Sequence, residues 1–437
     1  MATQHNLEIV PSNVTSNSKI SYRNGNPVIQ FIIGEQDAML LGNTLRFTGD
    51  FRTFLSNGSA SSAFVASPLA MSEKLGIYST IDTLTIKSQK TGQTIETIRH
   101  YNRFLSSYLP VTSSQQDNMG HLYNSALILP NYAAQQESVV NIPSASATNG
   151  ANHFCCALPC GLFNGRNPIP LMREAIGGLL VELHLAPDSQ VFHSQTDSSA
   201  SLTDSFYEYS DISIVCETME PDGPTMAKLK SQTSSTFEYN SINAYYQTIN
   251  SANGIINFQL GLSRVLGVFA NIVPAAHINN LLYDGLATLY PTNTDGSSAD
   301  ITEIFFTRNG TKFPLDFNVN TIQQSDPDDQ TIDPQLIYYY MDAIQKFADI
   351  KRTSINQVNT RLSDDPRFDK DFADGGCGFG VGVAFDRISD QGVDFSRVNF
   401  GINMSLGLTD DSPQAFYVFA HAKNTLVFGQ GGLQVMS

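Results

Sequence analysis

The sequence predicts an all-β protein built from two consecutive β-sandwiches with short inserted helices, and three observations support this fold class. First, several segments alternate between apolar and polar residues, as a strand with one buried face requires. Second, the expected elements of the first half of the 437-residue chain recur in the same order in the second half. Third, 27 Phe and 17 Tyr residues supply bulk for sandwich cores, whereas only 15% of the residues are charged.

The first half is predicted to contain short strands and one helix. Residues 43–54 alternate as a strand, with Gly49 at a bend or bulge. Residues 80–109 are predicted to form a strand, a glycine-containing turn and a helix, because apolar residues from Ile95 to Tyr108 recur at spacings of three and four. Three further strands are expected after this helix: 154–163, 176–187 and 206–220.

The second half repeats this order about 220 residues later, without detectable residue identity. Two strands, 237–249 and 254–262, flank a polar turn and are predicted to pair with each other. A helix is predicted over 333–350, with Asp333 as its N-cap and Pro334 in its first turn. The strands that match those of the first half are 379–386, 398–408 and 415–428.

This duplication divides the chain at a point where Pro221, Gly223 and Pro224 interrupt the strand pattern. Each half has the size of an eight-stranded jelly roll, so the predicted fold is two tandem eight-stranded jelly-roll sandwiches. A single large β domain without internal symmetry is the alternative. The expected units are an N-terminal arm, a first jelly roll, a linker and a second jelly roll: 1–24, 25–221, 222–236 and 237–437.

Charge and composition exclude several classes of function. The formal net charge is −16, from 41 acidic and 25 basic residues, so the folded domains are not expected to bind nucleic acid directly. No apolar stretch has the length of a transmembrane helix or the form of a secretory signal, so no membrane insertion is expected. The odd number of cysteines, five, favours reduced thiols in an intracellular setting.

Two groups of small residues are similar to a metal-binding clip and to a phosphate-binding loop. The strand pattern explains both groups better as packing positions. Cys155, Cys156 and Cys160 resemble a metal clip, but neighbouring residues of a strand point to opposite faces, so we interpret them as small buried hydrophobes. The alternate glycines of GCGFGVG lack the spacing of a phosphate-binding loop and predict a bare strand face against which a neighbour can pack closely. These glycines are Gly376, Gly378, Gly380 and Gly382.

Two groups of polar residues were candidates for a binding site. Glu182 and His184 with His193 are interpreted as solvent-facing positions of the strand pattern. The acidic segment Asp326–Asp333, which includes Asp328 and Asp329, lacks the glycine and final glutamate of an EF-hand; an ion between subunits stays open as an alternative to a solvated loop. No catalytic, cofactor-binding or metal-binding residue is predicted, no cofactor is expected, and the chain is not expected to be an enzyme.

The order of elements resembles the double jelly-roll major capsid proteins of double-stranded DNA viruses, particularly those of polinton-like viruses and virophages. The resemblance begins near residue 25 and is carried by five segments: NTLRFTGDF, TIETIRHYNRF, IPLMREAIGGLLVELHLAP, YEYSDISIVCE and AFYVFAHAKNTLVFGQGGLQV. It implies a homotrimer whose six sandwiches form a pseudo-hexagonal capsomer of an icosahedral virion. Neighbouring capsomers, penton proteins and minor capsid proteins are the partners it implies, with no catalytic residues.

Two other functions remain open at this point. A carbohydrate-binding or carbohydrate-cleaving β-sandwich is one, although the absence of Trp removes the largest flat apolar side chain that such proteins offer to a sugar ring. A viral spike or fibre subunit is the other, because it would also form trimers. The polar residues 1–20 are predicted to lie beneath a shell and to connect neighbouring trimers.

Overall fold

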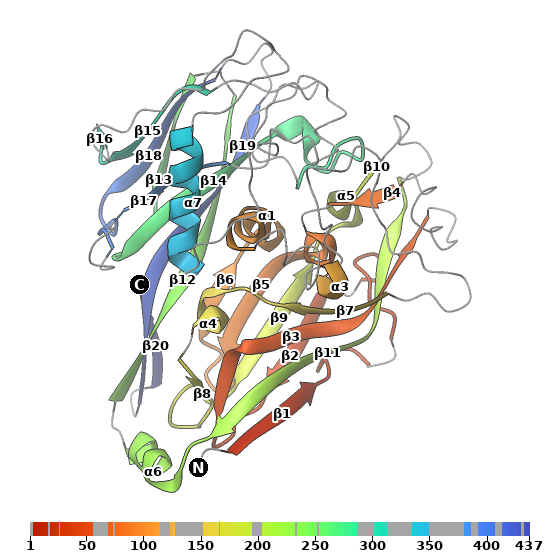
Figure 1. Cartoon of the computed structure of the whole chain (residues 1–437), viewed down its shortest axis with the longest axis vertical. Helices are drawn as coiled ribbons and strands as arrows, with labels where there is room; N and C mark the ends of the chain where they lie inside the picture. Colours follow the sequence, from red (N-terminus) through yellow and green to blue (C-terminus); the bar gives the residue numbers. More distant parts are fainter. Residues whose placement is uncertain are drawn as a thin grey trace.

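The computed structural model shows two antiparallel β-sandwiches that follow one another along the chain (Figure 1). The first lies toward the N-terminus and the second above it in the view of Figure 1. The structure describes these residues: 3–15, 18–25, 27–55, 69–72, 75–113, 123–126, 152–165, 167–194, 203–231, 234–250, 253–286, 301–312, 334–348, 380–385, 392–406, 413–429 and 432–437.

The first sandwich consists of a five-stranded and a four-stranded sheet, with a two-stranded sheet beside them. The five-stranded sheet runs in the order β1 (Thr3–Ile9), β11 (Phe206–Glu220), β3 (Met39–Phe54) and β7 (Asn152–Ala157), with β8 (Ile169–Pro170) also paired to β3. The opposing sheet contains β2 (Val28–Ile33), β9 (Leu179–Leu185), β5 (Ile81–Ser88) and β6 (Thr94–Ile98). The remaining elements of this half are β4 (Leu69–Met71), β10 (Phe192–Ser194), η1 (Gly76–Thr80), α1 (Tyr101–Thr112), α3 (Tyr123–Ala126), α4 (Gly161–Asn164) and α5 (Asp188–Val191).

The second sandwich has the same plan. One sheet runs in the order β12 (Ser234–Ile249), β19 (Gln414–Gly429), β14 (Val265–Pro274) and β17 (Val381–Ala384), with β20 (Gly432–Met436) also paired to β19. The other contains β13 (Asn253–Gln259), β18 (Asn399–Leu406), β15 (Ile301–Arg308) and β16 (Thr311–Lys312). The remaining described elements are α6 (Gly223–Ser231), η3 (Ala275–His277) and α7 (Pro334–Ala348).

The duplication predicted from the sequence is therefore confirmed at the level of strand order. The order β1-β11-β3-β7 corresponds to β12-β19-β14-β17, and the order β2-β9-β5-β6 corresponds to β13-β18-β15-β16. In each half a helix comes later in the chain than the corresponding edge strand of the four-stranded sheet: α1 after β6, and α7 after β16. The chain has two tandem jelly-roll sandwiches, as predicted.

The alternating strands bury the faces that the sequence predicts. On β18, Phe400, Ile402, Met404 and Leu406 are all buried. The predicted strands 206–220 and 415–428 coincide with β11 and, to within one residue at each end, with β19. The predicted second helix is α7, and its apolar stripe of Leu336, Tyr340, Ile344 and Phe347 is buried. Asp333 lies outside the described residues.

Three predicted elements were wrong in type or pairing. The helix begins at Tyr101, and Ile95 and Ile98 belong to β6, because this segment pairs in register with β5. The strand predicted over 154–163 ends at Ala157, before Pro159, which has no N–H to donate to a ladder, and α4 follows.

The third correction concerns β12 and β13, which do not pair with each other. β12 pairs with β19 and β13 with β18, so the two strands lie in opposite sheets. The rings of Tyr245 and Phe258 accordingly face each other across the core, with centroids 6.0 Å apart. Burial of an apolar face on both strands favours this crossing of the core over a hairpin.

The expected N-terminal arm and the expected linker both contain secondary structure. Residues 3–9 of the expected arm form β1 at the edge of the first sandwich, and Ile20 bridges to Tyr209. The expected linker contains α6, a helix with no buried residue that the sequence analysis missed. We propose that α6 lies in the linker 222–236 between the two domains. Within the described part of the chain, no helix has the length and apolarity of a membrane span.

Candidate functional site: the junction between the sandwiches

Helix α1 occupies the contact between the two sandwiches, and every one of its residues is buried. Phe104 of this helix packs against three rings of the second sandwich. Its ring centroid lies 5.8 Å from that of Phe347 on α7, 5.9 Å from Phe419 on β19 and 6.3 Å from Phe269 on β14. Such aromatic packing contributes both buried area and preferred ring geometry, so α1 belongs to the core that joins the two halves.

Polar groups on α1 fix its position on the second sandwich. The Arg103 guanidinium lies 4.2 Å above the Tyr417 ring and donates a hydrogen bond to the Gly285 carbonyl oxygen at 2.7 Å. Asn271 of β14 donates to the Arg103 carbonyl oxygen at 2.7 Å and accepts a hydrogen bond from Ser107. Because Arg103 and Asn271 are both almost fully buried, loss of either partner would leave polar groups unsatisfied.

A buried carboxylate, Glu96 on β6, connects three segments at this junction. Its Oε1 accepts hydrogen bonds from the backbone N–H of Gly161 at 3.1 Å and of Ile242 at 3.2 Å, and its Oε2 accepts one from Leu162 at 3.0 Å. Ile242 belongs to β12 of the second sandwich, whereas α4 belongs to the first. Burial raises the pKa of the Glu96 carboxyl to about 7, against the lowering effect of the three N–H donors.

The backbones of α4 and β12 come unusually close beside Glu96. A Cβ atom on Gly161 would lie only 1.4 Å from the Asn240 carbonyl oxygen, so no other residue fits there without a shift. Tyr239 of β12 donates its hydroxyl to the Ile95 carbonyl oxygen at 2.6 Å. Edge strands β6 and β12 are thus joined by side-chain-to-backbone hydrogen bonds, which cover the backbone groups that each edge would expose.

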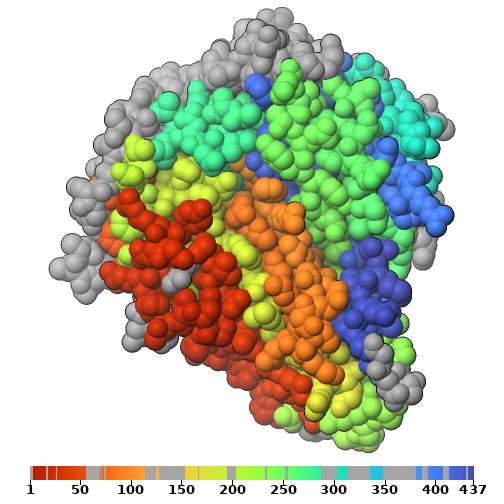
Figure 2. All heavy atoms as spheres, turned by 180° about the vertical axis from the view of Figure 1, so that it is seen from behind, coloured from red at the N-terminus to blue at the C-terminus, as the bar shows by residue number. Residues whose placement is uncertain are grey.

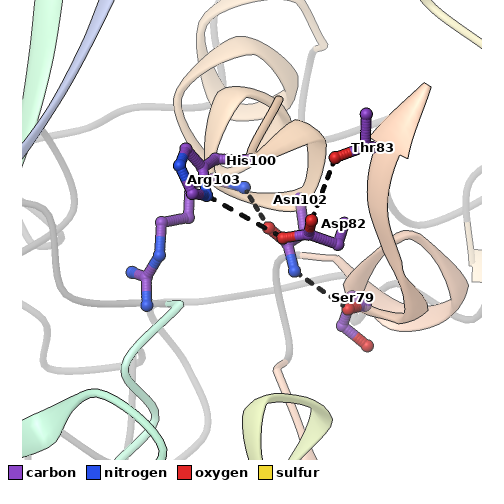
Figure 3. A network of polar contacts seen from close by, with 6 residues as sticks. All are labelled: Ser79, Asp82, Thr83, His100, Asn102 and Arg103. Atoms are coloured by element: carbon purple, nitrogen blue, oxygen red, sulfur yellow. Dashed lines mark hydrogen bonds and ion pairs between the residues drawn. The ribbon is translucent and has the colours of Figure 1, made fainter. Parts of the chain in front are cut away.

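The start of α1 is held by a second polar network (Figure 3). His100 adopts left-handed backbone angles with φ 53°, and its Nδ1 lies 3.8 Å from Oδ1 of Asp82. Asn102 donates to the Ser79 carbonyl oxygen at 3.2 Å and accepts from the Arg103 N–H at 2.8 Å. Burial lowers the pKa of His100, which Asp82 opposes. These contacts set the direction in which α1 leaves the first sandwich.

The structure separates the cysteines that the sequence places together. Cys155 is exposed and Cys156 buried, which confirms that they occupy opposite faces of β7; the prediction of a small buried hydrophobe holds for Cys156 and Cys160 and is wrong for Cys155. Cys160 caps α4, because its Sγ accepts a hydrogen bond from the Phe163 N–H at 3.4 Å. Cys377 lies outside the described residues. Among the residues that the structure describes, no group of three or more His, Cys, Asp or Glu side chains is arranged to hold a metal ion.

The other candidate residues do not form one site. Glu182 is buried, contrary to the prediction, because Lys87 at 2.6 Å and Gln30 at 2.8 Å cover its carboxylate on the outer face of the sheet. His184 is half-buried on β9, whereas His193 lies on β10, in a different sheet, and is buried, contrary to the prediction of a solvent-facing position. The acidic segment from Asp326 to Asp333 is outside the described residues.

The glycine stripe has the predicted packing role where the structure describes it. A Cβ on Gly382 would lie 3.1 Å from the Tyr340 Cα and 3.2 Å from the Phe269 Cβ, so α7 packs directly on β17. The junction residues Glu96, Arg103 and Gly161 were not predicted. Glu96 lies within the segment from Ile95 that the sequence predicts as helical, and no feature of the sequence marks it as buried.

The strand order, the duplicated sandwiches and the helix between them define the double jelly-roll fold. No protein-family model matches the chain, and no curated protein matches its sequence. Three solved structures share the fold over nearly the full length of the chain. VP54 of PBCV-1, fitted into a cryo-EM reconstruction of the virophage Sputnik, has a TM-score of 0.59 and 9% identity, with 100% of this chain and 97% of that chain covered.

The other two structures agree with this assignment. The cryo-EM structure of the Sputnik virophage gives a TM-score of 0.54 and 11% identity, covering 100% of this chain and 88% of that one. The major capsid protein of Faustovirus gives 0.50 and 8%, covering 98% and 91%. At these identities the likeness establishes the fold.

Proposed function

We propose that the chain is a major capsid protein, a structural subunit that forms homotrimeric, pseudo-hexagonal capsomers of an icosahedral viral shell. The observation that carries this proposal is that both sandwiches together match chains from virus structures. The match covers 88–97% of the length of those chains. The rigid junction around α1 agrees with this function, because two sandwiches held in one orientation let three chains present six similar edges to their neighbours.

The partners follow from the same proposal. The chain binds two further copies of itself, then neighbouring capsomers, and at the vertices penton and minor capsid proteins. It is a component of the virion, is assembled inside the host cell and has no catalytic activity. The net charge of −16 supports a shell whose folded domains make no direct contact with nucleic acid.

Mass measurement and electron microscopy of the purified protein test the proposal. Three chains of 47.8 kDa give a trimer of about 143 kDa in native mass spectrometry or light scattering. Negative-stain images of this species should show a block with a hexagonal outline. A chain that stays monomeric at concentrations of about 10 μM and above would contradict the proposal. An elongated trimer without a hexagonal outline would favour a spike or fibre instead.

A further inference from the structure

The contact between the two sandwiches predicts which surfaces meet between two copies of the chain. Within the chain, edge strand β6 of the first sandwich meets edge strand β12 of the second through Glu96 and Tyr239. The repeated strand order makes β16 the counterpart of β6, and β1 the counterpart of β12. If the second sandwich of one copy approaches the first sandwich of the next in the same way, β16 meets β1 of the neighbouring copy.

These two counterpart edges do not meet within one chain. β16 lies at the upper left of Figure 1 and β1 at the lower right, on opposite flanks of the molecule. Figure 2 shows the same separation from behind, with the N-terminal residues on one side and residues 301–312 on the other. A contact between them is therefore possible only between copies, and it would be heterologous, the type of contact that generates closed rings.

The exposure of the side chains differs between edge strand β12, which contacts β6, and edge strand β1, which has no such contact within the described residues. On β12, Tyr239 and Ile242 are 4% and 1% exposed, because the first sandwich covers them. On β1 the side chains are mostly exposed, and only Leu7 and Ile9 are half-buried. The helices differ in the same way, since α1 is buried on all sides whereas Tyr338 of α7 is 56% exposed.

The charges of the two open edges are complementary. The end of β15, the turn and β16 form what we call the basic hairpin, residues 307–312. It carries Arg308, whose guanidinium donates to the Asp394 carbonyl oxygen at 2.8 Å, and Lys312, whose ammonium lies 4.5 Å from the centre of the Phe305 ring. The opposite edge, which we call the acidic edge, is formed by β1 and the residues of β11 that pair with it, 214–220, and carries three carboxylates: Glu8, Glu217 and Glu220. His5, 3.6 Å from Glu220, also lies on this edge. In a chain with a net charge of −16, a basic hairpin facing away from an acidic edge favours attraction between copies.

We propose that the basic hairpin of one copy binds the acidic edge of the next copy and so repeats, between chains, the β6–β12 contact within the chain. This inference rests on the proposed homotrimer and names the surfaces that form it. Glu8 and Glu217 lie on the same face of the sheet, since Glu8 pairs with Val215 and Asn6 with Glu217. The lysine ammonium and these carboxylates lie near the surface, so their attraction is screened by salt.

Charge reversal with rescue tests this contact. Lys312→Glu and Glu8→Lys should each weaken trimer formation by about tenfold or more, measured as the protein concentration at half-assembly at about 0.1 M salt. The double variant should recover to within about threefold of the wild type, because it restores opposite charges across the contact. At about 1 M salt the differences among the variants should shrink. Lys228→Glu, on the exposed helix α6, is the matched control and should leave assembly unchanged.

The outcomes separate this contact from the proposed function. A wild-type trimer that both single reversals leave intact would overturn the contact while the capsid function stands. Failure of the double variant to recover, with all variants showing the wild-type circular dichroism spectrum and melting temperature, would also overturn the pairing. A wild-type chain that never forms trimers would overturn the proposed function, and this contact with it.

Discussion

Substitution of Glu96 by Gln should remove a specific part of the pH dependence of stability. The pKa of this carboxyl is about 7 in the folded protein, compared with 4.5 for a solvated glutamate. As the pH rises above 4.5, the unfolded chain loses this proton while the folded chain retains it until about pH 7. The free energy of unfolding therefore falls across this window, by about 3 kcal/mol when complete, and the loss persists above it.

The Gln variant carries no titrating group but has a different hydrogen-bonding pattern. Its carbonyl oxygen still accepts from Gly161 and Ile242, whereas its amide group faces the Leu162 N–H in place of Oε2. Two donors facing each other cost about 1–3 kcal/mol at every pH. The wild type should thus be more stable than Glu96→Gln at about pH 5, and this advantage should shrink by about 2–3 kcal/mol at about pH 8.

Urea unfolding of both proteins at about pH 5, 6, 7 and 8 measures this difference directly. All other titrating groups are shared, so their contributions cancel when the free energy of the variant is subtracted from that of the wild type. Protein concentration is kept constant, because self-association shifts apparent stability. A difference that stays constant within about 0.5 kcal/mol over the whole range would refute the reasoning that burial, and not the three N–H donors, dominates the ionisation of Glu96.

Three further predictions concern packing around the junction. Gly161→Ala should destabilise the protein by more than about 3 kcal/mol in thermal unfolding, since the new methyl overlaps the Asn240 carbonyl, whereas Gly165→Ala should change little because its Cβ meets only one atom, at 3.8 Å. Phe104→Ala should cost about 3–5 kcal/mol in urea unfolding, and a smaller loss than about 1 kcal/mol would contradict its place in the core. Burial lowers the pKa of His421 to about 3, so between about pH 6.5 and pH 3 unfolding takes up a proton and the wild type loses stability as the pH falls. His421→Phe should remove this part of the acid sensitivity. Equal loss of stability in both proteins as the pH falls would count against this.

The regular strands could be predicted because burial of alternating apolar side chains is the main determinant of their conformation. In β11 and β18, apolar side chains alternate toward a core, and in β11 this alternation persists on either side of two register shifts. The segment that became β6 was ambiguous, since Ile95 and Ile98 are three residues apart and fit a helix as well as a strand. Its pairing with β5 decided the outcome, and pairing with a partner strand is not visible in a periodicity.

The junction could not be predicted because its partners are far apart in sequence and are mostly backbone groups. Glu96 binds N–H groups near residue 161 and at residue 242, and the identity of a residue says little about its free N–H. Gly161 is required by the proximity of Asn240, which only the assembled sandwiches reveal. Arg103 is buried because the second sandwich covers α1, and a helical periodicity does not show what covers the helix.

The two halves share a plan, but their corresponding outer sheet faces have diverged. In the second sandwich, Tyr417 and Phe419 present rings toward α1, where they contact the Arg103 guanidinium and the Phe104 ring. On the corresponding strands of the first sandwich, Asp50 and Arg52 lie on the outer face, opposite Ser210 and Glu208. The two faces therefore differ together with what packs on them: the face of the second sandwich that contacts α1 carries aromatic rings, whereas the corresponding face of the first sandwich carries charged residues, with Asp50 beside His153.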